Sequence, residues 1–188
     1  MEVIMKKKNL GKVFALYPTP DTVIGTVVDG KVNWLNIAHL GVVGMDRIML
    51  SLSKNHFSNK GIRENKTASV NLVSKDMLIE ADYVGMVSGK NTDKSQVFDY
   101  FSGQLDNAPL IEKSKISMEC RLVDIYETEK EDNFILEVVN TYVDEDILNT
   151  SGKIDYSKAK PLLFEMTNQS YLETGKKVGD AWSEGKKY

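Results

Sequence analysis

The sequence predicts a mainly β protein in which antiparallel strands close into a small barrel, with a few short helices. Residues 22–28 are β-branched and end at Asp29–Gly30, a dipeptide typical of tight hairpins, so residues 31–38 can return alongside them. Residues 116–126 and 134–143 are two long strand candidates, and the polar residues between them make them a second hairpin. The connections between strand candidates are hairpins, whereas parallel crossovers need longer segments. Together these observations indicate antiparallel pairing.

The first half of the chain supplies the shorter strands. Residues 13–17 are apolar and are followed by two prolines, which exclude a continuing helix. Gly25, inside the first hairpin strand, marks either a bulge or the close approach of a flat group. Residues 48–52 form a short apolar strand, residues 59–65 a short helix, and residues 68–73 a further strand.

The second half adds the remaining elements. Residues 77–81 and 83–87 are short and show no clear period. Residues 96–101 have the aromatic spacing of a helix, for which Asp93 is a suitable N-cap. Residues 162–164 form a last short strand. The chain is therefore expected to contain six or seven strands and two or three short helices.

Composition indicates one soluble domain spanning residues 1–188, because 188 residues can bury a core without disulfides. A formal net charge of −3 argues against nucleic acid as the main partner, since phosphate backbones require a concentrated basic face. There is no run of 18 apolar residues and no signal-like segment before Tyr17. We therefore expect no membrane association and a cytoplasmic location.

Several classes of catalytic site find no support in the sequence. Two histidines and one cysteine offer no metal-binding cluster with usable spacing. Cys120 lies in a strand candidate and is expected to be a buried, unreactive thiol. The glycine patterns of a Rossmann site and of a nucleophile elbow are absent, and residues 85–92 depart from a P-loop in spacing and in the residue after Lys90. No catalytic side chain and no metal ligand is predicted.

A donor-rich loop before the first predicted helix is the most informative stretch. Ser51, Ser53, Lys54 and Ser58 lie in it, and the first N–H groups of a helix favour an anion. Ser58 is placed to cap the helix or to bind that anion. Spacing alone favours the plainer interpretation, a polar loop with an ordinary cap.

The order of several short motifs carries a resemblance to a known family. The motifs are Tyr17-Pro18-Thr19-Pro20, Asp29-Gly30-Lys31-Val32-Asn33, the serine loop, Ile62-Arg63-Glu64, Val70-Asn71-Leu72, Asp93-Lys94, and Tyr171 with Gly175, Val178 and Gly179. In this order they resemble the flavin reductase-like, FMN-binding split-barrel family, which includes the flavoredoxins. Each motif is weak alone, but together they span nearly the whole chain. The resemblance implies a split β-barrel.

The resemblance assigns the loop residues to FMN. Ser51, Ser53, Lys54 and Ser58 would bind the phosphate and the ribityl chain, with Ser58 matching the family threonine. Arg63 would reach the phosphate or pair with an acidic neighbour. Lys94 would lie near the flavin or near a nicotinamide phosphate, or would belong to a solvated helix start.

The family segment that runs along the flavin corresponds to residues 33–39. Asn33 matches the family pattern, whereas Asn36 replaces a threonine and Ala38 a serine, with Ile37 between them. Asn36 can still donate and accept at the polar edge of the ring, and Ala38 offers only its backbone. The alternative is a core strand. Trp34, Tyr171 and Trp182 can cover a flat ring, fill a subunit interface or belong to the core.

The implied function is an FMN-binding oxidoreductase that takes hydride from NADH or NADPH, as a homodimer with FMN at the subunit interface. Because the flavin carries the redox chemistry, no catalytic side chain is required. An alternative is a flavoredoxin-type electron carrier that meets a redox protein partner through acidic residues 124–132 and 144–146. A third is a split barrel that binds haem or free flavin without turnover, with His39 and His56 as candidate axial ligands.

Overall fold

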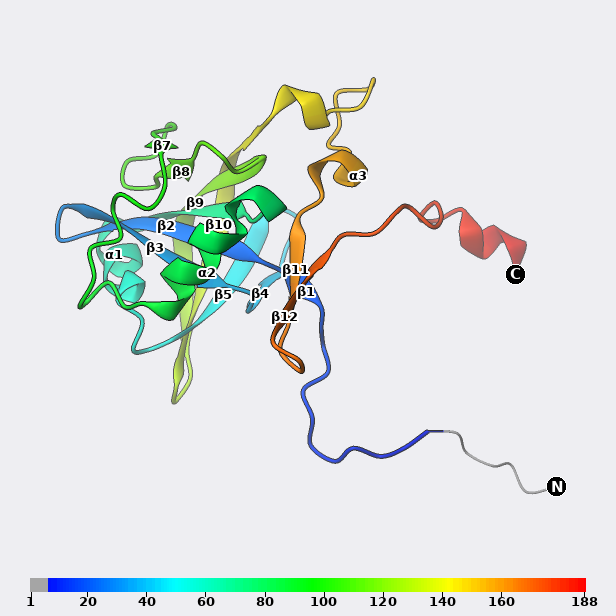
Figure 1. Cartoon of the computed structure of the whole chain (residues 1–188), viewed down its shortest axis with the longest axis horizontal. Helices are drawn as coiled ribbons and strands as arrows, with labels where there is room; N and C mark the ends of the chain where they lie inside the picture. The colour runs from blue at the N-terminus through cyan, green and yellow to red at the C-terminus, as the bar shows by residue number, and fades with distance from the viewer. Residues whose placement is uncertain (1–6) are drawn as a thin grey trace.

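A seven-stranded antiparallel sheet, curled into a half barrel, forms the centre of the structure (Figure 1). The structure is a computed structural model that describes residues 7–188. The order of strands across the sheet is β3-β2-β6-β9-β10-β5-β4. The strands are β2 (Thr22–Val28), β3 (Lys31–Ile37), β4 (Leu40–Val42), β5 (Arg47–Ser53), β6 (Thr67–Leu72), β9 (Ile116–Glu127) and β10 (Glu131–Val143). The predicted mainly β, antiparallel fold class is confirmed.

Both predicted hairpins are present. Asp29 and Gly30 join β2 to β3 with φ angles of +51° and +77°, the left-handed conformation that a two-residue hairpin turn requires. Strands β9 and β10 pair over nearly their whole length and leave only residues 128–130 for the turn. Two register shifts in this pair mark bulges, which bend the hairpin.

Two small sheets adjoin the central one. Strands β1 (Thr19–Pro20), β11 (Leu162–Glu165) and β12 (Ser170–Glu173) form one, and β7 (Tyr100–Phe101) with β8 (Leu110–Ile111) forms the other. Asp21 lies where the β1–β11–β12 sheet joins the central sheet. Its N–H donates to the carbonyl of Leu162 at 2.9 Å, and its carbonyl accepts from the N–H of Val73 at 3.0 Å.

The helices are short. They are α1 (Ser58–Asn65), α2 (Leu78–Met86) and α3 (Tyr156–Ala159), with 3₁₀ turns η1 (Lys75–Met77), η2 (Glu145–Ile147) and η3 (Glu184–Lys187). The predicted helix at 59–65 is confirmed as α1. Phe57 rather than Ser58 is its N-cap, and no side chain completes the cap.

The helix predicted over residues 96–101 is wrong. Its first residues form a turn, and the last two are strand β7. The aromatic spacing reflects packing on one large neighbour, because Phe98 and Tyr100 both meet the ring of Trp34 edge-on, at 5.5 and 6.0 Å between centroids. Asp93 instead closes a turn, accepting from the N–H of Ser95 at 3.0 Å.

The core lies between the curled sheet and its helices. Ile24, Leu50, Val70 and Phe134 are fully buried under α1. Cys120 is also fully buried, and desolvation raises its pKa to about 12, as expected of an unreactive thiol.

Trp34 anchors a second cluster beside α2 and is therefore a core residue. At Gly25, opposite Trp34, the structure shows the close approach of a flat group, which is the Trp34 ring, and no bulge in the pairing of β2 with β3. A Cβ there would lie 2.5 Å from both the Trp34 ring and the Ser69 hydroxyl oxygen.

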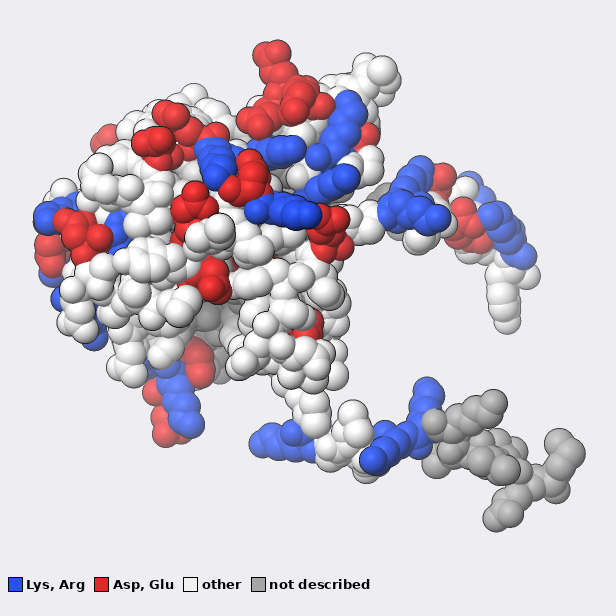
Figure 2. All heavy atoms as spheres, viewed as in Figure 1, with Lys and Arg blue, Asp and Glu red and all other residues white. Residues whose placement is uncertain are grey.

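Two extended arms leave the barrel on the same side (Figure 1). The first, residues 7–18, exposes Phe14 and Leu16, and the second, residues 174–188, exposes Val178 and Trp182 almost completely. Acidic and basic side chains are interspersed over the face in view in Figure 2. No helix within residues 7–188 is long and apolar enough to cross a membrane. Nor does that part of the chain gather three His, Cys, Asp or Glu side chains that could hold a metal ion.

Candidate functional site

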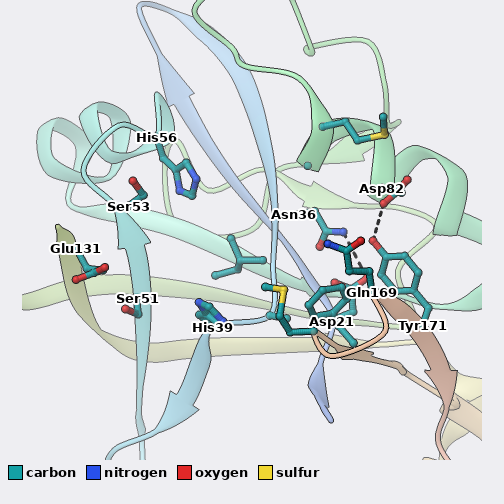
Figure 3. A pocket seen from close by; sticks show the side chains of 16 residues that line it. Asp21, Asn36, His39, Ser51, Ser53, His56, Asp82, Glu131, Gln169 and Tyr171 are labelled. Atoms are coloured by element: carbon teal, nitrogen blue, oxygen red, sulfur yellow. Dashed lines mark hydrogen bonds between the residues drawn. The ribbon is translucent and has the colours of Figure 1, made fainter. Parts of the chain in front are cut away.

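A cavity of about 690 Å³ opens between the central sheet, α2 and the β11–β12 hairpin (Figure 3). This is the size range of small-molecule and cofactor sites in proteins. Its walls combine the end of β3, alternate residues of β5, one face of α2 and the strands β11 and β12. We refer to it as the main cavity.

The middle of the main cavity is formed by the end of β3 and the residues after it. Asn36, Ile37 and Ala38 line it, as does His39. The Asn36 side-chain oxygen is buried and has no hydrogen-bond partner among the described residues, so a ligand in the cavity could donate to it. The ring of His39 is held by the Tyr17 hydroxyl at 2.7 Å.

One end of the main cavity is lined by side chains of the donor-rich loop and β10. Ser51, Ser53, His56 and Glu131 lie there (Figure 3). Ser51 and Ser53 share a face because alternate residues of a strand point the same way. Nδ1 of His56 is buried without a partner, and desolvation, followed by the nearby charge of Lys94, lowers the pKa of this histidine.

The opposite end carries two carboxyl groups. Asp21, Asp82 of α2 and Tyr171 of β12 meet there beside Asn36, and the Tyr171 hydroxyl donates to Asp82 Oδ1 at 2.7 Å (Figure 3). Burial and this hydrogen bond raise the pKa of Tyr171. Asp21 is 2% exposed, and burial raises its pKa to about 7. Sequence reasoning missed both carboxyls.

A second cavity of about 210 Å³ adjoins the main one and shares His56, Gly85 and Met86 with it. We call it the side cavity. Asn33, Ser58 and Lys94 line it, and the Asn33 amide donates to the Ser58 hydroxyl oxygen at 2.8 Å. Ser58 is thus occupied by a buried side-chain contact rather than by capping.

Lys94 is the unusual member of the side cavity. It is 3% exposed, and its ammonium donates to the carbonyls of Val84 and Val87 at 3.0 and 3.1 Å, at the end of α2. No carboxylate of residues 7–188 pairs with it, and burial lowers its pKa to about 8. It is therefore not part of a solvated helix start. An ammonium has three protons, so one remains for a ligand.

The structure thus sorts the predicted site residues into three groups. Asn36, Ile37, Ala38, Ser51 and Ser53 line the main cavity, and Asn33, Ser58 and Lys94 line the side cavity. Lys54 and Arg63 line neither of these cavities. Lys54 lies 3.9 Å from Glu127, while Arg63 lies 2.6 Å from Glu127 and 2.9 Å from Asp132. Arg63 therefore pairs with acidic neighbours, which the sequence analysis gave as the alternative to a phosphate contact.

The charge and the hydrogen-bonding groups of these residues fit FMN. The side cavity offers a buried cation without a carboxylate partner, which suits a phosphate, and the main cavity offers an unpaired amide oxygen beside apolar walls.

A family model described as "Flavin reductase like domain" matches residues 14–172. The chain belongs to the flavin reductase-like family. Among solved structures, this member is similar to a flavoredoxin from Methanosarcina acetivorans, with 34% sequence identity and a TM-score of 0.92, over 97% of this chain and 99% of that one.

Other solved structures share the fold of this flavin reductase-like chain. Flavoredoxin of Desulfovibrio vulgaris (Miyazaki F) is 29% identical, with a TM-score of 0.89, over 95% of this chain and 99% of that one. An FMN-binding protein from Thermus thermophilus, solved with bound 1-cyclohex-2-enone, is 20% identical, with a TM-score of 0.78, over 96% and 99% of the two chains. A search of curated proteins gives no significant match.

Proposed function

We propose that this flavin reductase-like chain is an FMN-binding oxidoreductase that uses the side cavity for the phosphate and the main cavity for the ring. The observation that carries the proposal is the separation of charge between the two cavities. Lys94 supplies a buried cation to the side cavity, whereas Asp21 and Asp82 lie at the far end of the main cavity. A phosphate dianion is attracted to Lys94 in the side cavity and repelled by the two carboxyl groups of the main cavity.

Lys94 and Ser58 are the proposed phosphate ligands. The third proton of Lys94 and the hydroxyl of Ser58 can donate to phosphate oxygens, and Ser58 is the first residue of α1, where helix N–H groups favour an anion. A bound dianion would compensate the burial of the ammonium, which the protein alone leaves unpaired.

Asn36, Ile37 and Ala38 are the proposed ring contacts, with Ser51 and Ser53 beside the ribityl chain. The unpaired oxygen of Asn36 accepts, and its amide nitrogen donates, so one side chain can serve both kinds of group on the polar edge of a flavin. When bound, FMN supplies the capacity to accept hydride or electrons. The protein binds and orients it, and neither task requires a catalytic side chain.

The phosphate assignment is tested by Lys94→Met, which keeps the side-chain length and removes the charge. Loss of one charge-assisted bond of about 1.5–3 kcal/mol predicts FMN affinity lower by roughly 10- to 100-fold, measured by fluorescence titration. The matched control is Lys158→Met, because Lys158 also donates to two backbone carbonyls but is exposed on α3. Equal FMN affinity in Lys94→Met and the native protein would overturn the assignment.

NADH or NADPH is the proposed hydride donor, and a protein partner is the alternative. Rapid anaerobic bleaching of bound flavin by either nucleotide in stopped flow supports a reductase. Slow bleaching with fast reduction by a redox protein supports the carrier. For the carrier, the acidic hairpin tip is a weaker docking surface than its sequence suggests, because Lys54 and Arg63 lie against Glu127.

We further propose a homodimer with the flavin at the subunit interface. The two arms support it, because Phe14, Leu16, Val178 and Trp182, which lie on them, are large apolar side chains that are mostly exposed. Segments of this kind become stable when they pack on another surface.

A further inference from the structure

Asp21 is a buried carboxyl in the wall of the main cavity, and its position is fixed by the backbone. Hydrogen bonds of 2.9 and 3.0 Å tie its N–H to Leu162 and its carbonyl to Val73, so the residue is held between two sheets. Its side chain lies at the end of the cavity where Asp82 and Tyr171 meet (Figure 3). Such a carboxyl costs stability when charged, and its location beside a ligand cavity calls for a functional explanation.

The side-chain partners of Asp21 do not compensate a negative charge. Among residues 7–188, its one hydrogen bond from another side chain comes from the Asn36 amide nitrogen at a long 3.5 Å, and the backbone of Thr22 donates a further one. The Tyr171 hydroxyl, which could have donated to it, donates to Asp82 instead. Desolvation raises the pKa of Asp21 to about 7, the Asn36 bond lowers it, and the charge of Asp82 raises it further.

The charged and titratable groups around Asp21 reinforce this arrangement. Asp82 faces it from α2 and Tyr171 from β12, while Asn36 of β3 is uncharged. His39, His56 and Glu131 line the same cavity further along. No lysine or arginine of residues 7–188 lines this cavity. When negative charge is added inside the cavity, we therefore expect Asp21 to be the first group that takes up a proton.

We propose that Asp21 is a proton-holding residue that, together with Asp82 and Tyr171, couples the reduction of bound FMN to the uptake of a proton from solvent. The inference rests on the proposed function. Hydride transfer to a bound flavin would bring two electrons and one proton and would leave the donor oxidised, so the site would gain one negative charge. Asp21 then takes one proton from solvent, no other bond forms or breaks, and the net charge of the site is unchanged. Asn36 is in contact with Asp21 and relays the effect to the ring edge.

The test is the midpoint potential of the FMN-loaded protein between pH 5 and pH 9, in the native form and in Asp21→Asn. Above about pH 7 the native protein should take up one more proton per electron pair than the variant. Each tenfold change in proton concentration then shifts the two-electron potential by about 30 mV more in the native protein. Asp124→Asn, which changes an exposed carboxyl outside both cavities, should follow the native profile.

A second variant and a cofactor-free measurement keep the test decisive. Asp82→Asn keeps Asp21 and removes the negative charge that repels its carboxylate. The pH at which the slope of the midpoint potential changes should therefore be lower in this variant. In the cofactor-free native protein, infrared spectroscopy should show the carbonyl band of a protonated carboxylic acid at pH 6. This band should disappear by pH 9 and be absent from Asp21→Asn.

The outcomes separate the inference from the proposed function. FMN retained by Asp21→Asn, with the same pH profile as the native protein, would overturn the inference and leave the proposed function standing. Absence of the infrared band at pH 6 would also overturn it. FMN that washes off the native protein at tens of micromolar would overturn both.

Discussion

Gly25 is the residue at which one added methyl group should disturb the structure most. An alanine Cβ would lie 2.5 Å from the Trp34 ring and 2.7 Å from the carbonyl oxygen of Pro109. Neither backbone nor a fully buried ring can yield cheaply, so Gly25→Ala should lower the free energy of unfolding by about 3 kcal/mol. Urea denaturation measures it. Gly41→Ala is the control, because nothing lies within 4 Å of the added atom, and an equal loss in both would contradict the prediction.

The stability of the cofactor-free protein should depend on pH through Asp21. Its pKa rises from 3.8 in the unfolded chain to about 7 in the folded protein, so between these values only the folded state holds the proton. Stability is therefore favoured below about pH 4 and falls as pH rises to 7, by on the order of 4 kcal/mol. Denaturant midpoints of native protein and Asp21→Asn across this window should diverge in favour of the variant. Parallel curves would refute the prediction.

The residue types in the sequence predicted some of the residues that line the site, but not the burial and the contacts that determine their chemistry. Asn33, Ser58 and Lys94 are separate in the sequence, and the resemblance named them without indicating that they line one cavity. Asp21 meets Asp82 and Tyr171 in the cavity wall only through the fold, and no local pattern distinguishes a carboxyl that will be buried from one on the surface. Cys120 was easier, because an isolated thiol within an apolar strand is usually buried.

At the scale of elements, α2 shows why one helix was missed while another was wrongly predicted. Ile79 and Met86 are apolar yet exposed, so the apolar face of α2 has no visible period. The segment at 96–101 shows such a period for a different reason, since Phe98 of a turn and Tyr100 of β7 both pack on Trp34. Tertiary contacts decided both cases.

The attachment of α1 to β10 should depend on Arg63. Arg63 lies 2.9 Å from Asp132, a buried carboxylate that also accepts from the Asn59 amide at 2.9 Å. Arg63→Met leaves that charge without its cation and should cost about 1–3 kcal/mol of unfolding free energy. Arg47→Met, which breaks only an exposed contact, should change stability by about 0.5 kcal/mol or less, measured by urea denaturation.

The same variant distinguishes the two interpretations of Arg63. With its guanidinium occupied by Glu127 and Asp132, we expect Arg63→Met to retain FMN with native affinity. A loss of affinity comparable to that of Lys94→Met would assign Arg63 to the phosphate.

For the whole molecule, the C-terminal arm should hold the proposed dimer together. Truncation after Thr174 removes Val178 and Trp182, which are both 95% exposed, and keeps β12 intact. Sedimentation equilibrium should show a dimer for the full chain and at least a tenfold weaker association after truncation. Lys187→Ala, at the exposed end of the same arm, should remain dimeric. A native protein that is monomeric at all concentrations would refute the proposal.

The order of strands in the whole sheet was beyond sequence reasoning. Strands β5 and β6 are close in the chain, yet β9 and β10 lie between them in the sheet. The two hairpins were predictable because their turns are local, whereas the pairing of β6 with β9 joins segments about fifty residues apart.

The burial of Cys120 has a practical consequence for following the motions of this protein. Its thiol is 0% exposed in the middle of β9, with a pKa raised to about 12, so a soluble alkylating reagent can reach it only after the central sheet opens. The rate of alkylation then reports the frequency of that opening, as amide exchange does, but at one chosen site and by simple mass measurement. Since it is the single cysteine of the chain, no other thiol would confuse the signal.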